Sequence, residues 1–365
     1  MADATKAAFQ TAQTLADKVG ETPLRFSILY GLMVIRYARG EPGEAVRHGQ
    51  SFVDLAEVAQ DTAPAVVANR SFAAALFLTG DFVRAQPFFD RAVALFNPEE
   101  HKNLANQYGQ DLGVGTHGLI TWNLLIRGKT QAAQKSLEMC ESSGDACDSI
   151  VSKCYVHLVG SLHSLITGNT RGLAWHSKLG FDLSNEYGIK IFQGFSGVSS
   201  GLVMLQQGNP AGLDFYQRFE ANFLAQGSKA ILTFHRLEAA RLLFELGLFD
   251  EADAMIAASK WLMDETGELF ALSDLYRLQA RISTHKSDPH AAEAQLLKAL
   301  AIARQQQAVL WELRAAIDLA HLWQEQGRID EAFALLDPVH NSIAEGDCPE
   351  DRATAQTMLV KFTTQ

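Results

Sequence analysis

A glycine-centred turn recurs along nearly the whole chain at an almost constant spacing. The turn positions are Gly40, Gly80, Gly128, Gly168, Gly208, Gly247, Ser287 and Gly327. The intervals between them are 40, 48, 40, 40, 39, 40 and 40 residues. A unit copied about eight times at such a period predicts a solenoid, in which each repeat packs only on its neighbours.

Small residues accompany the turns at two fixed distances. Five residues after the turn stand Ala45, Ala85, Ala133, Ala252, Ala292 and Ala332, with Leu173 and Leu213 as exceptions. Seven residues before it stand Ala73, Thr121, Ser161, Gly201, Ala240, Ala280 and Ala320, with Met33 as the exception. Apolar residues around them recur at three- and four-residue steps, the pattern of amphipathic helices. Each unit is therefore predicted to be two helices that approach closely across a glycine turn.

Composition excludes several classes of function. A net charge of −11 argues against nucleic acid as a direct partner, because phosphate binding needs a basic surface. No apolar run approaches the ~20 residues that cross a bilayer. Four cysteines in 365 residues do not form a disulfide framework. We therefore expect a cytoplasmic protein with reduced thiols and no membrane partner.

Three short motifs resemble catalytic or ligand sites but lack their context. Gly128-Lys129-Thr130 resembles the end of a phosphate-binding loop, but Asn123 stands where that loop needs glycine. Residues 113–118 spell G-x-G-x-x-G without the preceding strand of a dinucleotide site. Either this helix start needs close packing, or its free N–H groups bind an anion. Cys140 and Cys147 flank a short loop, and buried free thiols are favoured over a disulfide or a metal there.

No catalytic signature remains after these motifs are set aside. The eleven histidines form no H-E-x-x-H pattern, and the chain has no G-x-S-x-G turn. We therefore predict no enzyme activity, no cofactor and no metal site.

The helical unit resembles the tetratricopeptide repeat (TPR), although its period exceeds the usual 34 residues. Family-like segments at residues 20–32, 94–101, 108–114 and 313–339 resemble the C-terminal TPR region of bacterial AAA/STAND-type ATPase signalling proteins. In those proteins a class III adenylate/guanylate cyclase or a winged-helix DNA-binding domain often precedes the ATPase. The resemblance covers essentially the whole chain. It implies a sensing or regulatory arm.

The predicted fold is an all-α, TPR-like right-handed α-solenoid of about eight helix-turn-helix repeats, forming one domain over residues 1–365. Residues 1–20 are expected to be the leftover second helix of a preceding pair, which hints at a fragment of a longer chain. Residues 97–112 are an expected inserted loop, which explains the 48-residue interval. Residues 346–365 are an expected C-terminal capping helix. Pro98 and Pro338 are each expected to end a second helix.

Transfer of the inward-facing TPR positions predicts a groove that runs from an apolar floor to a basic end. Its candidate residues are Trp122, Leu158, Leu162, Leu165, Phe195, Val198, Leu202, Leu205, Phe234, Arg241, Arg277, Arg281, Arg314 and His321. The alternative is that these side chains pack between neighbouring helices. In the insertion His101, Tyr108, Gln110 and Asp111 are candidates for contact with a ligand or a neighbouring domain. Alternatively, Asp111 caps the next helix and Tyr108 fills a gap.

Three functions are consistent with these features. The leading hypothesis is a non-catalytic scaffold that binds a protein segment and regulates a signalling ATPase, cyclase or transcriptional regulator. The second is a sensor that holds a small acidic or apolar inducer in the groove. The third is self-association through the terminal repeats.

Overall fold

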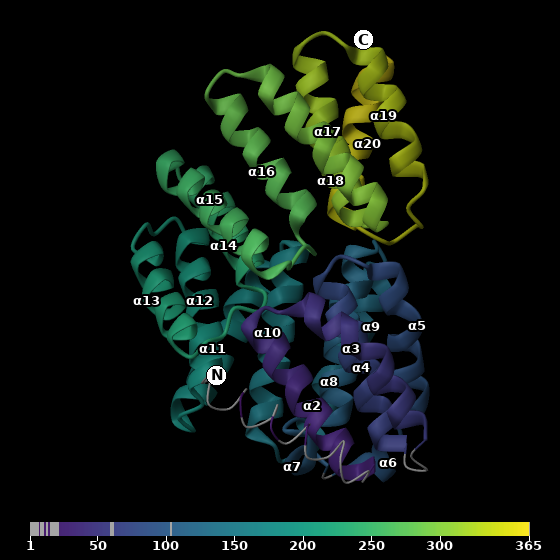
Figure 1. Cartoon of the computed structure of the whole chain (residues 1–365). Helices are drawn as coiled ribbons and strands as arrows, with labels where there is room; N and C mark the ends of the chain where they lie inside the picture. Colours follow the sequence, from purple (N-terminus) through teal and green to yellow (C-terminus); the bar gives the residue numbers. More distant parts are fainter. Residues whose placement is uncertain are drawn as a thin grey trace.

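The structure is a computed structural model, and it is all-α over the residues that it describes (Figure 1). These are residues 22–58, 62–102 and 104–364, together with the isolated positions 7, 11 and 14. No strand occurs in these ranges. The expected leftover helix at residues 1–20 lies outside them, apart from the isolated positions.

Eight pairs of antiparallel helices follow one another along the described chain. The first helices of the pairs are α2 (Thr22–Arg39), α4 (Thr62–Leu78), α8 (Leu112–Ile126), α10 (Ile150–Thr167), α12 (Lys190–Gln206), α14 (Leu232–Glu245), α16 (Leu272–His285) and α18 (Val309–Glu325). The second helices are α3 (Pro42–Glu57), α5 (Phe82–Leu95), α9 (Thr130–Ala146), α11 (Thr170–Glu186), α13 (Gly212–Ala225), α15 (Phe249–Thr266), α17 (Pro289–Gln306) and α19 (Ile329–Asn341). The short helices α6 (Pro98–His101) and α7 (Ala105–Tyr108) form the insertion, and α20 (Pro349–Thr364) follows the last pair.

The predicted turn residues separate the two helices of each pair. Seven of them are glycines with φ between 69° and 81°, the left-handed region that glycine enters without a Cβ clash. Ser287 adopts φ 60° at the equivalent position. In the second pair Asp81 caps α5 by accepting a hydrogen bond from the Arg84 N–H.

The predicted small residues lie where the paired helices touch. Ala73 and Ala85 are fully buried between α4 and α5. A Cβ on Gly201 would lie 2.8 Å from the backbone nitrogen of Tyr216, so α12 and α13 approach nearly backbone to backbone. The all-α, TPR-like solenoid predicted from the period is confirmed.

A second series of left-handed residues marks the turns between pairs, and sequence analysis missed it. It comprises Gly188, Gly227, Gly267, Gln307 and Gly346. These residues recur every 39 or 40 positions, about half a period after the first series. Both kinds of turn are therefore built on the same backbone conformation.

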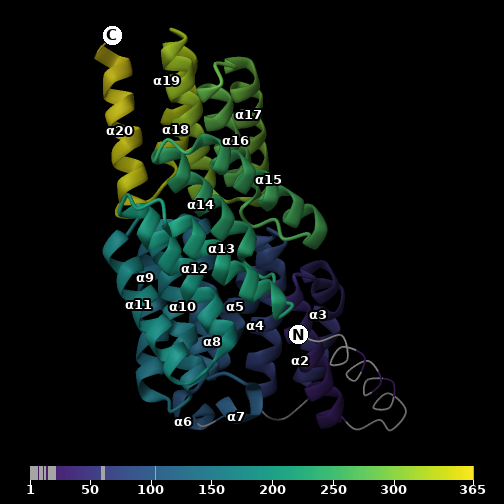
Figure 2. The ribbon, with the colours of Figure 1, turned by 90° about the vertical axis from the view of Figure 1, so that its left-hand side faces the viewer.

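The solenoid coils into two stacked tiers, which Figures 1 and 2 show from perpendicular directions. The lower tier holds α2 to α13, and the upper tier holds α14 to α20. Two equivalent backbone bonds join them, from Lys229 N–H to the Ala38 carbonyl (2.8 Å) and from Leu269 N–H to the Leu78 carbonyl (2.7 Å). The two acceptors, Ala38 and Leu78, lie at the C-terminal ends of α2 and α4. Carbonyls in the last turn of a helix have no hydrogen-bond donor within that helix, so they are available to the upper tier. We call this boundary the seam.

The seam continues beyond the insertion through bonds that each involve one side chain. The Arg314 guanidinium donates to the Ile166 carbonyl (2.7 Å), and the Cys348 N–H donates to the Thr130 hydroxyl (2.8 Å). The upper tier thus rests on the turns of the first four repeats.

The chain crosses between tiers at residues 226–231, and Glu268 holds the end of this crossover. Ile231 has φ 58°, a strained conformation for a β-branched residue. Its N–H donates to Glu268 Oε2 (2.9 Å), and the Thr233 hydroxyl donates to the other carboxylate oxygen. Glu268 is only 1% exposed and has no cationic partner among the described residues, so burial raises its pKa to about 7.

The expected effect of the two prolines holds for one helix only. Helix α5 ends at Leu95, and Pro98 starts the short helix α6. Helix α19 continues to Asn341, so the prediction that Pro338 ends it is wrong. A proline removes one helical N–H donor, and the helix retains a bond from Ser342 N–H to the Pro338 carbonyl.

Candidate functional site

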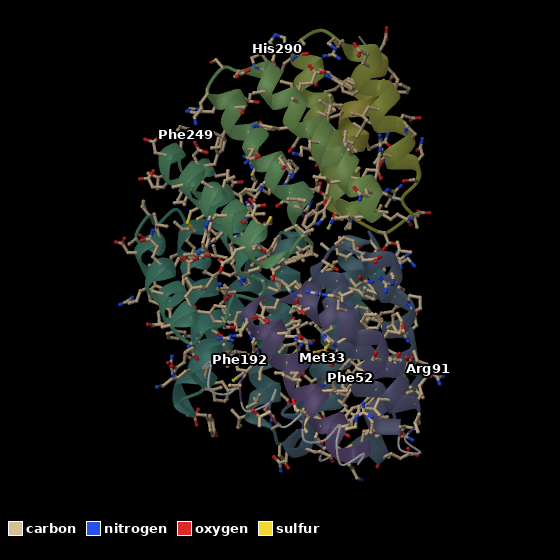
Figure 3. All side chains as sticks on the ribbon, viewed as in Figure 1. Met33, Phe52, Arg91, Phe192, Phe249 and His290 are labelled. Carbon is tan, nitrogen blue, oxygen red and sulfur yellow. The ribbon has the colours of Figure 1, made fainter. Side chains whose placement is uncertain are left out.

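A cavity of about 440 Å³ opens on the concave side of the lower tier, between the first helices of successive pairs. Its lining comes from α2, α4, α8, α10 and α12, from one residue of α3, and from α7 with the two residues that follow it. Met33 of α2 and Phe192 of α12, labelled in Figure 3, both belong to it. The remaining lining residues are Tyr30, Gly31, Val34, Tyr37, Ala45, Arg70, Ser71, Ala74, Ala75, Gln107, Tyr108, Gly109, Gln110, Leu119, Val151 and Tyr155. The surface is mostly apolar, with a few polar groups.

Arg70 is the one charged side chain among the described residues of this lining. It is 3% exposed. Its guanidinium donates two long hydrogen bonds, to the Tyr30 hydroxyl and to the Asp111 carbonyl, each at 3.4 Å. The Tyr30 hydroxyl itself donates to the Tyr108 carbonyl (2.6 Å). No carboxylate of the described residues forms an ion pair with Arg70.

The insertion closes one end of the cavity. Tyr108 and Gln110 line it, and Tyr108 packs edge-on against the Tyr30 ring. Asp111 caps α8 through the Val114 N–H (2.9 Å), the structural role considered for it. His101 is buried away from the cavity, where its Nε2 lies 2.7 Å from the Thr62 hydroxyl.

The three glycines of the G-x-G-x-x-G spelling sit inside α8, and each provides room for a neighbour. A Cβ on Gly113 would lie 2.6 Å from the Ser143 hydroxyl, and one on Gly118 would lie 2.7 Å from Val159. A Cβ on Gly115 would lie 1.9 Å from Arg70 Nη1. The motif therefore serves close packing, and Gly115 makes the space that the guanidinium occupies.

The apolar floor expected for the groove is part of the core. Trp122, Leu158, Leu162, Leu202 and Phe234 are between 0% and 6% exposed, and so are the related candidates Leu165, Val198 and Leu205. Phe195 is partly buried against Phe223. These side chains pack between helices, as the alternative interpretation proposed, and they do not form a surface open to a partner.

The expected basic end is neutralised within the upper tier. Arg241 pairs with Glu238 and Glu245 (2.9 and 3.0 Å). Arg277 pairs with Asp274 and Asp318 (2.8 and 3.2 Å).

The other two predicted arginines and the predicted histidine are also engaged. Arg314 binds Asp351 of α20 (3.0 Å) within the upper tier, and Arg281 lies over the Phe244 ring, 4.8 Å from its centroid. His321 is exposed and lies 3.5 Å from Glu325. The basic side chains predicted to capture a partner therefore contact other residues of this chain.

The cavity and the predicted groove involve some of the same first helices but different residues of them. The cavity is lined by Leu119, Tyr155 and Phe192, each three residues before a predicted groove residue. Arg70 was missed altogether. It lies in α4, whose other residues are almost all apolar and buried on every side. A single arginine inside such a helix is the signal that identifies it.

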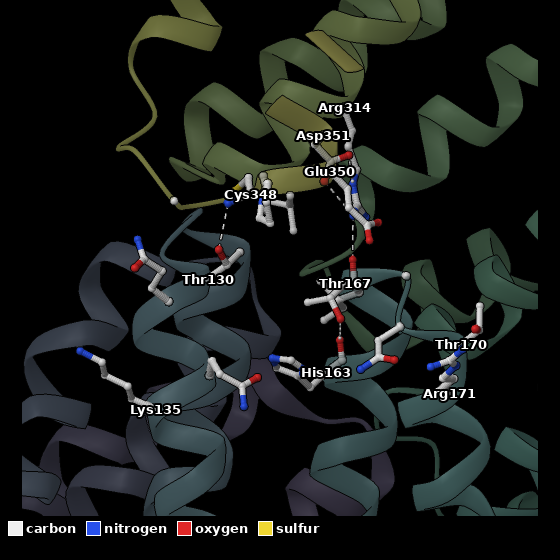
Figure 4. A pocket seen from close by; sticks show the side chains of 18 of the residues that line it. Thr130, Lys135, His163, Thr167, Thr170, Arg171, Arg314, Cys348, Glu350 and Asp351 are labelled. Atoms are coloured by element: carbon white, nitrogen blue, oxygen red, sulfur yellow. Dashed lines mark hydrogen bonds and ion pairs between the residues drawn. The ribbon is translucent and has the colours of Figure 1, made fainter. Parts of the chain in front are cut away.

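A second, more open cleft of about 770 Å³ lies at the seam (Figure 4). It is bounded by α9, by the end of α10, and by the starts of α11, α18 and α20. Lys135, Glu138, Arg171 and Glu350 all line it, so it carries both signs of charge.

The remaining chemistry of the described residues is limited. Their four cysteines are free thiols, and three of them are buried, whereas Cys147 is half-buried. No group of three or more His, Cys, Asp or Glu side chains in the described ranges is arranged to hold a metal ion. None of the described helices combines the length and apolar character needed to cross a bilayer.

These features define a TPR-like repeat protein with a cavity on its concave face. No protein-family model and no curated protein matches the sequence. Among solved structures, a STAND protein with a tetratricopeptide repeat sensor from Pyrococcus horikoshii is 13% identical, with a TM-score of 0.44 over 99% of this chain. This chain spans 55% of that protein's length. Yeast Tom70 is 12% identical, with a TM-score of 0.45 over 100% of this chain and 90% of Tom70. At these scores the similarities carry no information about function.

Proposed function

We propose that this chain is a non-catalytic regulatory scaffold that responds to a small organic molecule bound in the concave cavity of its lower tier. The observation that carries the proposal is the cavity itself, with Arg70 buried in a largely apolar lining. Ligand sites are typically concave, of ~300–1,000 Å³, and apolar with a few placed polar groups. A cavity of about 440 Å³ lined in this way fits that description.

The larger setting of the proposal rests on motifs in the sequence. Residues 94–101, 108–114 and 313–339 resemble the TPR arm of bacterial STAND-type ATPases and their cyclase or DNA-binding fusions. In such an arm, ligand binding in the lower tier would alter the seam and thereby the surface offered to a catalytic or DNA-binding domain. The ATPase connection and a cytoplasmic location are part of this proposal.

A thermal-shift screen of metabolite classes tests the proposal. A ligand at 100 times its Kd stabilises the folded state by about 2.7 kcal/mol, which raises the Tm measurably. The variant Val34→Trp places a large side chain on the cavity lining, at a residue that is 40% exposed. We expect it to abolish the shift produced by any hit. Val83→Trp on α5 is the matched control, because Val83 is 38% exposed and lies outside the cavity. Hits that survive Val34→Trp would contradict the proposal.

Capture of a protein segment is the second candidate, and the open seam cleft favours it. The cleft has a larger volume than the cavity and carries both charge signs, which suits an extended polar segment. Lys135→Glu together with Arg171→Glu should weaken capture of such a partner. Unchanged capture would exclude the cleft. Self-association is tested by light scattering at several concentrations, where a monomer at all of them would exclude it.

A further inference from the structure

Arg70 differs from the other buried arginine of the described chain in having no counterion. Arg236 is 8% exposed, and its guanidinium contacts Glu220 Oε1 at 2.7 Å and the Ala258 carbonyl at 2.8 Å. Arg70 is 3% exposed and has only two 3.4 Å contacts, both to neutral oxygens. A buried charge without a partner is strongly unfavourable, so proteins usually pair it.

The acidic residue whose backbone contacts Arg70 uses its carboxylate elsewhere. Asp111 offers the guanidinium its backbone carbonyl, while its carboxylate caps α8 through the Val114 N–H. The unpaired guanidinium is nevertheless given space, because Gly115 lacks the Cβ that would overlap Nη1. The position of Arg70 is therefore built into the packing of α4 against α8.

Two further hydrogen-bond donors face the same cavity. Among the described residues, neither the Tyr37 nor the Tyr155 hydroxyl has a hydrogen-bond partner. Burial raises the pKa of both phenols, so both keep their protons at neutral pH. Tyr30, Tyr37, Tyr155 and Arg70 all line this one cavity. A guanidinium fork with nearby phenols is a donor set that suits a carboxylate.

The rest of the lining determines the other end of the ligand. Met33, Val34, Ala74, Leu119 and Phe192 provide an apolar wall. A phosphate monoester would bring close to two negative charges to one cation, and the described lining holds no second one. A single carboxylate on an apolar body matches both the charge and the surface.

We infer that the cavity binds a small monocarboxylic acid with an aliphatic or aromatic body, whose carboxylate pairs with Arg70 and accepts hydrogen bonds from Tyr37 and Tyr155. This inference rests on the proposed sensing function and names the chemical class of its ligand. The carboxylate of the bound acid acts as the counterion that Arg70 lacks in the ligand-free protein.

Matched pairs of probes test the inference on the full chain. Decanoate and 4-phenylbutyrate are compared with decanamide and 4-phenylbutanamide by calorimetry and thermal shift. We expect at least one acid to bind at least tenfold more tightly than its amide. Arg70→Met should remove that preference, and Tyr155→Phe should reduce the affinity of the acid severalfold.

The stability of the ligand-free variants gives an independent readout. Replacing an unpaired buried charge with an apolar side chain of similar length removes its desolvation cost, so Arg70→Met should raise the Tm of the free protein. Arg236→Met is the matched control and should lower it, because Glu220 then loses its partner. A loss of stability in Arg70→Met equal to that in Arg236→Met would make Arg70 a structural residue and overturn the inference.

The outcomes separate the inference from the function on which it rests. Acids and amides that bind the wild type equally well, and that no longer bind Val34→Trp, would overturn the carboxylate assignment and leave sensing intact. Acids that fail to bind would also overturn the assignment, while the metabolite screen would still decide on sensing. If no hit depends on the cavity, the proposed function fails as well.

Discussion

Replacement of Glu268 by glutamine should stabilise the protein at alkaline pH and have much less effect in acid. Glu268 lies under the crossover between tiers, where its carboxylate accepts from the Ile231 N–H and the Thr233 hydroxyl. Glutamine retains both contacts, because its oxygen accepts from Ile231 and its amide donates to Thr233. The substitution therefore removes the charge and keeps the geometry.

The pKa of Glu268 sets the size of the effect. Burial raises that pKa from 4.5 to about 7, against smaller opposing effects of its two hydrogen bonds. Because the folded-state pKa is the higher one, folding favours the protonated acid. The penalty is absent below pH 4.5, grows between pH 4.5 and 7, and is complete above pH 7. At 1.36 kcal/mol for each pKa unit, the full penalty is about 3 kcal/mol, of which about 1 kcal/mol is present at pH 5.

Urea unfolding of the wild type and Glu268→Gln at pH 5 and pH 8 measures this difference. The free-energy gap in favour of the variant should widen by about 2 kcal/mol between the two values. Glu251→Gln, at an exposed position of α15, controls for the general loss of one negative charge. A gap that stays constant with pH would show that Glu268 is already ionised at pH 5 in the folded protein and would refute the reasoning.

Three further substitutions probe the packing. Gly201→Ala should lower stability by about 1–3 kcal/mol, because its Cβ would meet the backbone of Tyr216; an unchanged urea midpoint would contradict the close approach of α12 and α13. Trp122→Ala should cost about 3–5 kcal/mol, since the ring is fully buried, and a loss below 1 kcal/mol would argue for a surface role instead. Arg314→Met should leave Asp351 unpaired and speed hydrogen exchange at the start of α20, whereas exchange identical to the wild type would show that this ion pair does not stabilise α20.

The helical pairs were predictable because their determinants are local. A turn with positive φ selects glycine, and a close helix contact selects alanine, so both leave a period in the sequence. Gln307 shows the limit of this signal. It adopts φ 51° in the second series of turns, but because it is not a glycine, the sequence gives no sign of a turn at this position.

The site was less predictable because it depends on angles between repeats. A rotation of one position turns a helix face by about 100°, and the expected groove residues Trp122 and Leu158 fell on the buried side. Arg277 was predicted to face a partner, but its guanidinium contacts Asp318, which lies 41 residues further along on the next first helix. Stacking of the tiers depends on the small rotation between successive repeats, which side-chain volumes set jointly and no single residue encodes.

The seam also changes how this solenoid should respond to force. An open solenoid extends like a spring, since each repeat touches only its neighbours and stability adds along one dimension. Here the Ala38 and Leu78 carbonyls are bonded to residues 191 positions further along the chain. Pulling the two ends apart must first rupture these bonds between tiers, after which the coils can lengthen. A single-molecule extension curve should therefore begin with a stiff phase and a distinct rupture event, and repeats nearly five units apart should lose their structure together.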